Sequence, residues 1–395
     1  MKSKKTTLQV LLEILLVSTK LGFTSFGGPI AHLGYFHKEY VHKKNWITER
    51  NYADLVALCQ FLPGPASSQV GMGIGIIRGG VLGGIVSFIG FTLPSVLALI
   101  VFALVVNGLH IKDDTWIHGL KIVAVVVVAE AIIGMSKKLT PDLKRKTIAL
   151  LAIIITLLLP TAYTHIVVII LSGIIGYIFY KEFNDSDTSN LLIPISKRLG
   201  AVCLFLFFGL LLVLPILNQI TTVGWIDLFD RFYRSGALVF GGGHVVLPLL
   251  EQELVTTDWI SNSAFLTGYG AAQAVPGPLF TFAAYLGTVI SGWQGGVLAT
   301  IAIFLPAFLL IYGTMPFWNS IRTSRYMNGA FMGINAAVVG ILISSFYQPI
   351  WTSTILSTFD FVFAAILYTL LVYWKIPPWI IVVIGGLGGF LLSFI

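Results

Sequence analysis

Thirteen apolar stretches follow one another along this chain of 395 residues, separated by short polar or glycine-containing segments. The hydrocarbon core of a bilayer is about 30 Å thick and takes about 20 helical residues to cross, a length that most of the stretches reach or approach. Helices suit a membrane core because each backbone polar group finds a partner within its own segment. We therefore predict an all-α polytopic membrane protein of about 13 transmembrane segments, over residues 8–26, 52–77, 81–106, 117–135, 147–160, 163–180, 198–217, 223–241, 262–291, 294–316, 328–347, 355–374 and 377–394.

The composition argues against other classes of protein. Only 10% of the residues are charged, against about 25% in soluble proteins, which argues against a soluble enzyme or a nucleic-acid-binding protein. The net charge of +7 fits Lys and Arg in cytoplasmic loops. Two cysteines, Cys59 and Cys203, lie in apolar runs and do not indicate a disulfide scaffold. We interpret the first stretch, which carries Glu13 and Lys20, as a membrane helix rather than a signal peptide, and predict a location in the cytoplasmic membrane.

The chain repeats itself. Five short motifs occur twice, in the same order, at offsets of 212 to 216 residues. We predict a first repeat at 8–181, a second at 222–395, and a connecting segment at 182–221 with one unmatched helix at 198–217. The paired motifs are Phe26-Gly27-Gly28 with Phe240-Gly241-Gly242, Trp46-Ile47 with Trp259-Ile260, Pro63-Gly64-Pro65 with Pro276-Gly277-Pro278, Gly79-Gly80-Val81-Leu82 with Gly295-Gly296-Val297-Leu298, and Leu93-Pro94 with Leu305-Pro306.

The distribution of Lys and Arg predicts an orientation. The loop 137–146 is the richest in basic residues, so we place it in the cytoplasm together with the N-terminus. If every stretch crosses once, seven spans separate equivalent points and the repeats are inverted. The basic loop 37–50 then falls outside, against the rule. A re-entrant hairpin at 52–77 would bring that loop inside, but would move the N-terminus out and make the repeats parallel; we favour crossing segments.

Two Pro-Gly-Pro motifs are candidate substrate-binding breaks. Pro63-Gly64-Pro65 divides 52–77 into two half-helices of about 17 Å each. Proline and glycine interrupt the helix, and the second half-helix then begins near the midplane with unpaired amides that attract anions. A structural kink is the alternative. Polar residues are more numerous after the first break than after the second, so we expect an asymmetric site. The candidates at the two breaks are Gln60, Pro63, Gly64, Pro65, Ser67, Ser68 and Gln69, and Gln273, Pro276, Gly277, Pro278 and Thr281.

Paired glycines and charged residues complete the set of candidates. Gly27-Gly28 and Gly241-Gly242 mark a second pair of breaks, although helix packing alone can explain such glycines. Charges at membrane depth are costly and tend to be functional, with snorkelling to the interface as the alternative. The candidates are Lys20 and Arg234 as fixed cations at equivalent positions, His32, His244 and Glu39 beyond the glycine breaks, Arg78 as a gate residue or a topology signal, and Glu130 as a proton-titrating group or the partner of a cation.

Motifs for nucleotide binding, metal binding or hydrolysis are missing from the sequence. There is no GxxxxGK[ST], complete GxGxxG, HExxH or GxSxG, and no Cys/His cluster has metal-ligand spacing. We therefore expect no enzyme activity, no cofactor and no bound metal.

The run from Phe26 to Pro94 resembles the chromate ion transporter family, and the second-half motifs resemble the two-domain, long-chain form of that family. The resemblance implies an inner-membrane carrier of about 13 helices in antiparallel repeats, which exports chromate by means of the membrane potential or a proton gradient. One departure is His37, where many members of the family have Arg. The matching segments are Phe26-Gly27-Gly28-Pro29, Ala31-His32-Leu33-Gly34, the run from Tyr52 to Gly71, and the run from Gly90 to Ser95.

We therefore expect a secondary transporter that exports chromate or a similar tetrahedral oxyanion. A carrier of sulfate or another small anion, with chromate as a mimic, is the alternative. An intramembrane enzyme or a receptor would need a nucleophile pair, metal ligands or a sensory domain, and the sequence has none of these. The expected partners are the anion and the lipid bilayer, with no nucleic acid, and a homodimer is the candidate assembly.

Overall fold

The protein is described by a computed structural model that covers residues 6–108, 114–159, 164–180, 194–220, 223–240, 245–318 and 325–392. These residues form helices and no strand, so the predicted all-α class is confirmed. Six helices are long and apolar enough to cross a bilayer, and three shorter apolar helices accompany them. Three predicted site residues, Gly241, Gly242 and His244, lie outside the described residues.

The helices of the first half are α1 (Thr7–Thr24), α2 (Gly28–Phe36), the π-helix η1 (His37–Lys43), α3 (Glu49–Phe61), α4 (Ala66–Gly108), α5 (Asp114–Leu139), α6 (Leu143–Leu158) and α7 (Thr164–Phe179). A single helix, α8 (Lys197–Ile220), follows. The second half contains α9 (Gly224–Ala237), α10 (Val246–Leu254), α11 (Asn262–Ala274), η3 (Leu279–Thr281), α12 (Phe282–Thr314), η4 (Met315–Phe317), α14 (Arg325–Ser345), η5 (Phe346–Trp351), α15 (Thr352–Thr354), α16 (Thr358–Val372) and α17 (Pro378–Leu392).

Helices α4 and α12 each reverse direction within their bounds. The backbone of α4 leaves helical geometry at Gly79 and Gly80, where Gly80 has φ +64°. The Ser87 hydroxyl donates a 2.9 Å hydrogen bond to the Gly71 carbonyl, whereas 16 residues of straight helix would span about 24 Å. The chain therefore forms two antiparallel arms, residues 66–78 and 81–108, which we call the first and second arms of α4.

The corresponding reversal in α12 lies at Ser291 and Gly292, where Gly292 has φ +67°. Its two arms are residues 282–290 and 293–314. The sequence paired Gly79-Gly80 with Gly295-Gly296. The reversal of α12 instead lies four residues before that motif, about one helical turn away.

The segments 52–77 and 262–291 do not cross as single broken helices. A Cβ atom placed on Gly73 would lie 2.7 Å from Leu55 Cδ1, so α3 packs beside the first arm of α4. A helix that continued in one direction would separate these residues by about 27 Å. In the second repeat the Gly268 backbone contacts the Tyr285 ring in the same way. The prediction of crossing segments is wrong, because each Pro-Gly-Pro motif turns the chain back on itself.

Helix α1 also forms a hairpin, with α2 and η1. The hydroxyls of Ser18 and Tyr40 are 3.3 Å apart, and Lys44 Nζ lies 3.9 Å from Glu13 Oε1. The basic loop 37–50 therefore returns to the end of the molecule where α1 begins. This removes the loop's disagreement with the positive-inside rule, since the N-terminal helix and the loop lie at one end.

The second arms of α4 and α12 pack against each other in opposite directions. Tyr312 Oη donates a 2.6 Å hydrogen bond to the Val81 carbonyl, and the ring centroids of Phe88 and Phe304 are 5.0 Å apart. Residue numbers thus rise along one arm as they fall along the other. The second arms are therefore antiparallel, whereas the inversion of the whole repeats stays a prediction.

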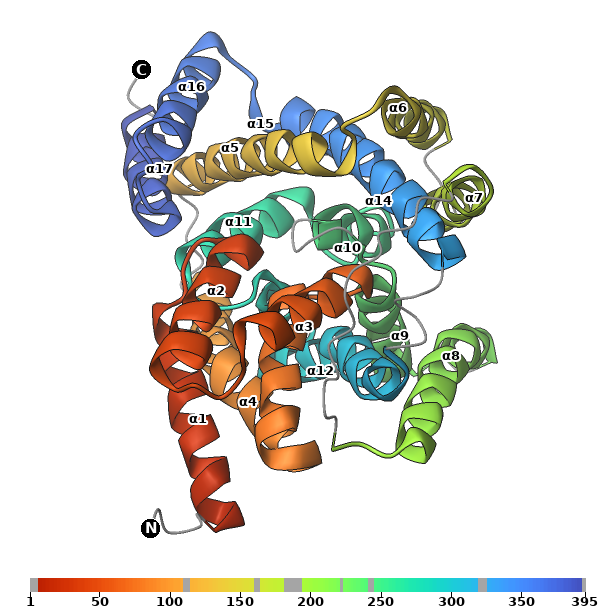
Figure 1. The fold of residues 1–395 in the computed structure, drawn as a ribbon. Helices are drawn as coiled ribbons and strands as arrows, with labels where there is room; N and C mark the ends of the chain where they lie inside the picture. Colours follow the sequence, from red (N-terminus) through yellow and green to blue (C-terminus); the bar gives the residue numbers. More distant parts are fainter. Residues whose placement is uncertain are drawn as a thin grey trace.

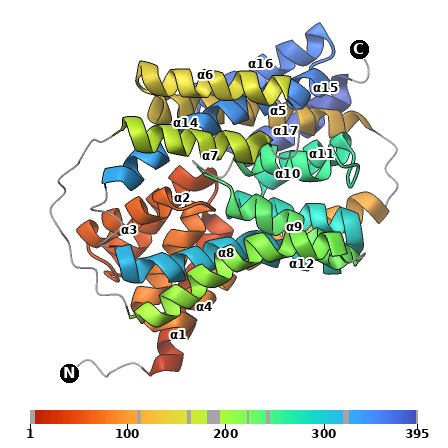
Figure 2. The same cartoon turned by 90° about the vertical axis from the view of Figure 1, so that its right-hand side faces the viewer.

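Outer helices of each half pack on the other half. Figure 1 shows α5 and α14 crossing beyond the hairpins, with α6 and α7 beside α14 and with α16 and α17 beside α5. Glycines permit these close approaches: Gly340 contacts the Ala149 backbone, and Gly119 contacts Gly385. In Figure 2, the axes of α6, α7, α8 and α12 lie roughly parallel to one another, as expected for helices that share a membrane.

Candidate functional site

The tip of each Pro-Gly-Pro hairpin contacts the other half of the chain. The amide of Gly64 donates a 2.7 Å hydrogen bond to the Val239 carbonyl, and the amide of Gly277 donates a 2.9 Å bond to the Ser25 carbonyl. Ser25 and Val239 each lie just before the Phe-Gly-Gly motif of their own repeat. The four breaks found in the sequence therefore meet in two reciprocal pairs.

Glycine is required at both tips. Gly64 has φ +110° and Gly277 has φ +111°, a region that residues with a Cβ atom rarely adopt. Pro63 and Pro65 flank Gly64 and are buried, whereas Pro276 is half-buried. Each motif therefore combines a glycine in a backbone conformation that other residues rarely adopt with two prolines, which interrupt a helix.

Helices begin at each break. Helix α2 begins at Gly28, α4 at Ala66, α10 at Val246 and η3 at Leu279. The first amides of a helix have no intrahelical acceptor and carry a partial positive charge. Gly27 and Gly28, with φ +95° and +77°, lead the chain into α2. We call the four breaks with their two reciprocal bonds the junction; a helix N-terminus, which favours an anion, follows each described break.

Polar side chains gather on the side of this junction next to Gly277. A Cβ atom on Gly277 would lie 2.7 Å from Ser95 Oγ. His32 Nδ1 is 3.3 Å from Ser67 Oγ, and the His32 ring meets the Phe91 ring edge-on with centroids 5.6 Å apart. Together with neighbouring buried hydroxyls these residues form what we call the polar cluster: Ser25, His32, Ser67, Ser68, Thr92 and Ser95.

Several members of the polar cluster have a buried polar atom that finds no partner among the residues that the structure describes. An unpaired buried donor or acceptor costs about 1–3 kcal/mol, so such atoms indicate a place prepared for a ligand or water. If the Ser67 hydroxyl donates to His32 Nδ1, the remaining Nε2–H of His32 is a donor. The unpaired atoms are Ser25 Oγ, His32 Nε2, Ser68 Oγ and Thr92 Oγ1.

The equivalent positions of the second repeat are apolar except for Thr281, the counterpart of Ser68. Gly64 has Ala307 beside it where Gly277 has Ser95. The other counterparts of the cluster include Val239 for Ser25 and Phe280 for Ser67. The described part of the junction is therefore asymmetric, with the polar groups contributed mainly by the first repeat. Ser25, Thr92 and Ser95 were not among the sequence candidates, although a comparison of the two repeats would have singled them out.

Three predicted polar residues serve the breaks themselves or line the approach. Gln69 Nε2 donates a 2.9 Å hydrogen bond to the Pro63 carbonyl, and Thr281 Oγ1 donates a 2.7 Å bond to the Pro278 carbonyl. Both bonds close the turn after a Pro-Gly-Pro motif. Gln60 is exposed at the end of α3, so its carboxamide is open to a ligand that arrives from solvent.

The predicted cations Lys20 and Arg234 are paired with acids of their own hairpins. Lys20 Nζ lies 3.5 Å from Glu39 Oε2, and Arg234 makes two hydrogen bonds of 2.7 and 3.0 Å to the Glu253 carboxylate. Glu39 and Glu253 are equivalent at the repeat offset of 214. The pairs therefore join α1 to η1 and α9 to α10, and a role of these fixed cations toward an anion stays a prediction.

Electrostatics keep Glu39 ionised. Burial alone would raise the pKa of Glu39, but the hydrogen bond from Lys43 and the positive charges of Lys20 and Lys43 outweigh it, so the pKa lies below its ordinary value. Glu39 is thus the acidic centre of an ion-pair network rather than a proton carrier at neutral pH.

Arg78 lies at the end of the first arm of α4, away from the polar cluster. Arg78 Nη2 is 3.5 Å from Glu13, and its guanidinium lies 5.4 Å from the Trp46 ring centroid. The first arm of α4 places it about 18 Å of helix from Ala66, and its role as a gate residue or a topology signal stays a prediction. Glu130 is exposed on α5 rather than enclosed by the helix packing.

Access to the junction also differs between the repeats. One face of α3, formed by Ala53, Ala57 and Gln60, is exposed. Its counterpart on α11 is covered: Leu266 is buried, and a Cβ atom on Gly270 would lie 2.6 Å from the Leu120 carbonyl of α5. The corresponding faces of α3 and α11 therefore differ in exposure.

Comparison with known proteins identifies relatives along most of the chain. A probable chromate transport protein of Synechococcus elongatus is 28% identical over 94% of this chain and 92% of its own length. An uncharacterized transporter of Methanocaldococcus jannaschii is 27% identical over 84% of this chain and 83% of its own length. The chromate transport protein of Pseudomonas aeruginosa is 25% identical over 82% and 77%. No solved structure matches the chain.

The family model for chromate transporters matches two regions, residues 12–177 and 226–390. Each region contains one Phe-Gly-Gly motif and one Pro-Gly-Pro motif, the elements that form the junction. With its apolar helices, this is a multi-pass protein of the cell membrane and a transporter rather than an enzyme. The chain belongs to the chromate transporter family.

Proposed function

We propose that this protein exports chromate, or a tetrahedral oxyanion of the same charge, across the cytoplasmic membrane as a secondary transporter. The observation that carries the proposal is the set of buried polar atoms in the polar cluster that have no partner in the described part of the chain, at a junction where helices begin. A buried charge needs compensating donors, since leaving it unpaired costs several kcal/mol. Hydroxyls of Ser25, Ser68 and Thr92 with Nε2–H of His32 are donors of the kind that oxyanions accept. The relatives named as chromate transport proteins support chromate as the anion.

We further propose that residues 8–181 and 222–395 are inverted repeats, joined by 182–221, and that the basic end of the molecule faces the cytoplasm. The antiparallel second arms of α4 and α12 and the reciprocal bonds at Gly64 and Gly277 support this arrangement. Transport then exchanges the roles of the two repeats. The exposed face of α3 closes, the face of α11 leaves α5, and the anion passes from the cytoplasmic to the external side.

Sulfate is the second candidate, because it is also a tetrahedral dianion and would use the same donors. Everted membrane vesicles, whose cytoplasmic face is outside, distinguish the two. We expect vesicles with this protein to accumulate radiolabelled chromate, excess unlabelled sulfate to compete weakly, and an ionophore to abolish accumulation. Uptake of sulfate in preference to chromate would identify a sulfate carrier, and uptake that survives the ionophore would contradict coupling to an ion gradient or membrane potential.

A further inference from the structure

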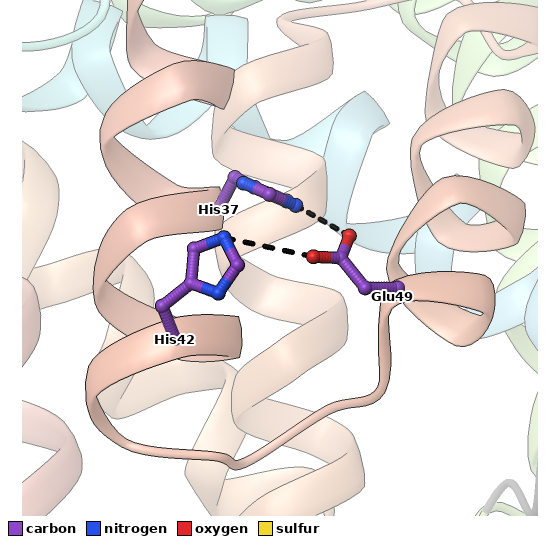
Figure 3. A group of neighbouring side chains, drawn as sticks. All are labelled: His37, His42 and Glu49. Carbon is purple, nitrogen blue, oxygen red and sulfur yellow. Dashed lines mark hydrogen bonds and ion pairs between the residues drawn. The ribbon is translucent and has the colours of Figure 1, made fainter.

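Two histidines and a glutamate meet at the turn between η1 and α3 (Figure 3). His37 Nε2 lies 2.5 Å from Glu49 Oε2, and His42 Nε2 lies 3.6 Å from Glu49 Oε1. The two imidazole rings are 4.7 Å apart between centroids. One ligand atom from each of the three residues lies within 4.8 Å of the other two. Imidazole nitrogen and carboxylate oxygen are preferred ligands of Zn²⁺ and related divalent metals.

The local backbone brings these residues together. His37 and His42 are five residues apart at the two ends of a π-helix, whose i to i+5 hydrogen bonding brings such positions onto one face. Glu49 is the first residue of α3, and the Thr48 side chain fixes that start by accepting a hydrogen bond from the Asn51 amide. A search for ligand spacing in the sequence misses the cluster, because an ordinary α-helix would point residues 37 and 42 in different directions.

The geometry suits a tetrahedral ion. With metal–ligand distances of about 2.0–2.1 Å, ligand atoms in a tetrahedral site are about 3.3 Å apart. One ligand atom from each residue already lies within 4.8 Å of the other two, so small side-chain rotations are enough to reach this spacing. The side chains of His42 and Glu49 are 60% and 62% exposed, which lets an ion enter from solvent and leaves room for a water as the fourth ligand.

Neighbouring lysines are engaged elsewhere. Lys43 Nζ lies 3.2 Å from Glu39, and Lys44 Nζ lies 3.9 Å from Glu13. The ion pairs described for Glu49 are those with the two histidines. A cation can therefore bind the Glu49 carboxylate without displacing Lys43 or Lys44.

We propose that His37, His42 and Glu49 bind one divalent transition-metal ion, with Zn²⁺ as the probe. The ion joins the hairpin of α1 and η1 to the hairpin of α3 and α4, next to the exposed face of α3. This adds a site to a chain for which the sequence predicted no bound metal. It does not depend on the proposed function, since metal binding is measured without transport.

The test uses the purified full-length protein, freed of metal, in detergent. Isothermal titration with zinc chloride should give one Zn²⁺ per chain, and Zn²⁺ should raise the melting temperature because it binds the folded state. Cobalt(II) should give the visible absorption of a tetrahedral complex. The variants His37→Ala, His42→Ala and Glu49→Gln should each lose at least about tenfold in zinc affinity.

His118→Ala is the matched control. His118 lies on α5 and forms a hydrogen bond with Asp360, so its replacement should leave the zinc affinity unchanged. His42→Ala also serves as the folding control, since its side chain is largely exposed and its loss should not lower the melting temperature of the metal-free protein. Zinc affinity that is equal in the three variants and the parent, or absent from the parent, would overturn the proposal.

Discussion

The amide of Gly277 donates a hydrogen bond of 2.9 Å to the carbonyl of Ser25, and this bond joins the tip of one hairpin to the break of the opposite repeat. Its counterpart runs from Gly64 to Val239. The two bonds occupy equivalent positions but differ in their surroundings. Ser25 carries a hydroxyl that has no described partner, whereas the side chain of Val239 carries no hydroxyl. The backbone framework is thus common to both repeats, whereas the polar side chains belong mainly to the first.

Gly277→Ala should reduce transport at least about tenfold. A Cβ atom at φ +111° is strained by about 1–3 kcal/mol and would approach Ser95 Oγ to 2.7 Å. The measurement is initial chromate uptake into everted vesicles at matched protein level. Gly134→Ala is the control, because a Cβ atom there meets nothing within 4 Å. Normal uptake by Gly277→Ala would show that the tip geometry is dispensable.

The double substitution Ser67→Ala and Ser68→Ala should cut chromate transport by about tenfold or more, since each lost donor to an anion costs about 1–3 kcal/mol and 1.4 kcal/mol is a factor of ten. Both hydroxyls are buried beside the junction. Ser136→Ala, on the exposed part of α5, is the control. Flux and binding should fall together while membrane insertion stays constant; unchanged flux would remove both serines from the site.

Glu39→Gln should lower the thermal stability of the purified protein, because it removes the carboxylate that Lys20 and Lys43 contact. The folded-state pKa of Glu39 is lowered, so its stabilisation is complete above the unfolded pKa and is lost as the pH falls through the folded pKa. The melting temperatures of parent and variant should therefore differ at pH 7 and converge in acid. A difference that grows toward low pH would contradict this assignment.

Ala53→Cys should react with an impermeant thiol reagent in everted vesicles, whereas Leu266→Cys should resist it in both intact cells and everted vesicles. The two positions are equivalent at the repeat offset of 213, but Ala53 is exposed and Leu266 is 1% exposed. The background lacks Cys59 and Cys203. Labelling of Ala53→Cys only in intact cells would reverse the proposed orientation, and equal labelling of both positions would contradict the asymmetric access.

Motif pairing in the sequence located the parts of the junction correctly. The Phe-Gly-Gly and Pro-Gly-Pro pairs do lie at helix breaks where the structure describes them, and α8 has the place of the unmatched helix. These features are predictable because proline and glycine act on the backbone locally. The same local reasoning explains the start of α11 at Ser261, whose side chain accepts a hydrogen bond from the Ala264 amide.

The direction of the chain after each break was not predictable from the sequence. Hydropathy gives the length of an apolar segment, but whether the second half-helix continues or turns back depends on contacts such as Leu55 with Gly73. The ionic partners of Arg78 and Lys20 were hidden for the same reason. Ser25 and Ser95 differ from their counterparts Val239 and Ala307 in the sequence, but only the structure shows that the tip of the opposite hairpin lies beside them.

The reciprocal bonds at Gly64 and Gly277 have a consequence for biogenesis. During synthesis, the first hairpin tip emerges well before the carbonyl of Val239, and the carbonyl of Ser25 precedes the amide of Gly277 by 252 positions. Neither half can complete its own tip, so the junction assembles only after the second half has been inserted. Two separately expressed polypeptides, cut within 182–221, should therefore complement each other when made together, and each should be a substrate for quality-control proteolysis when made alone.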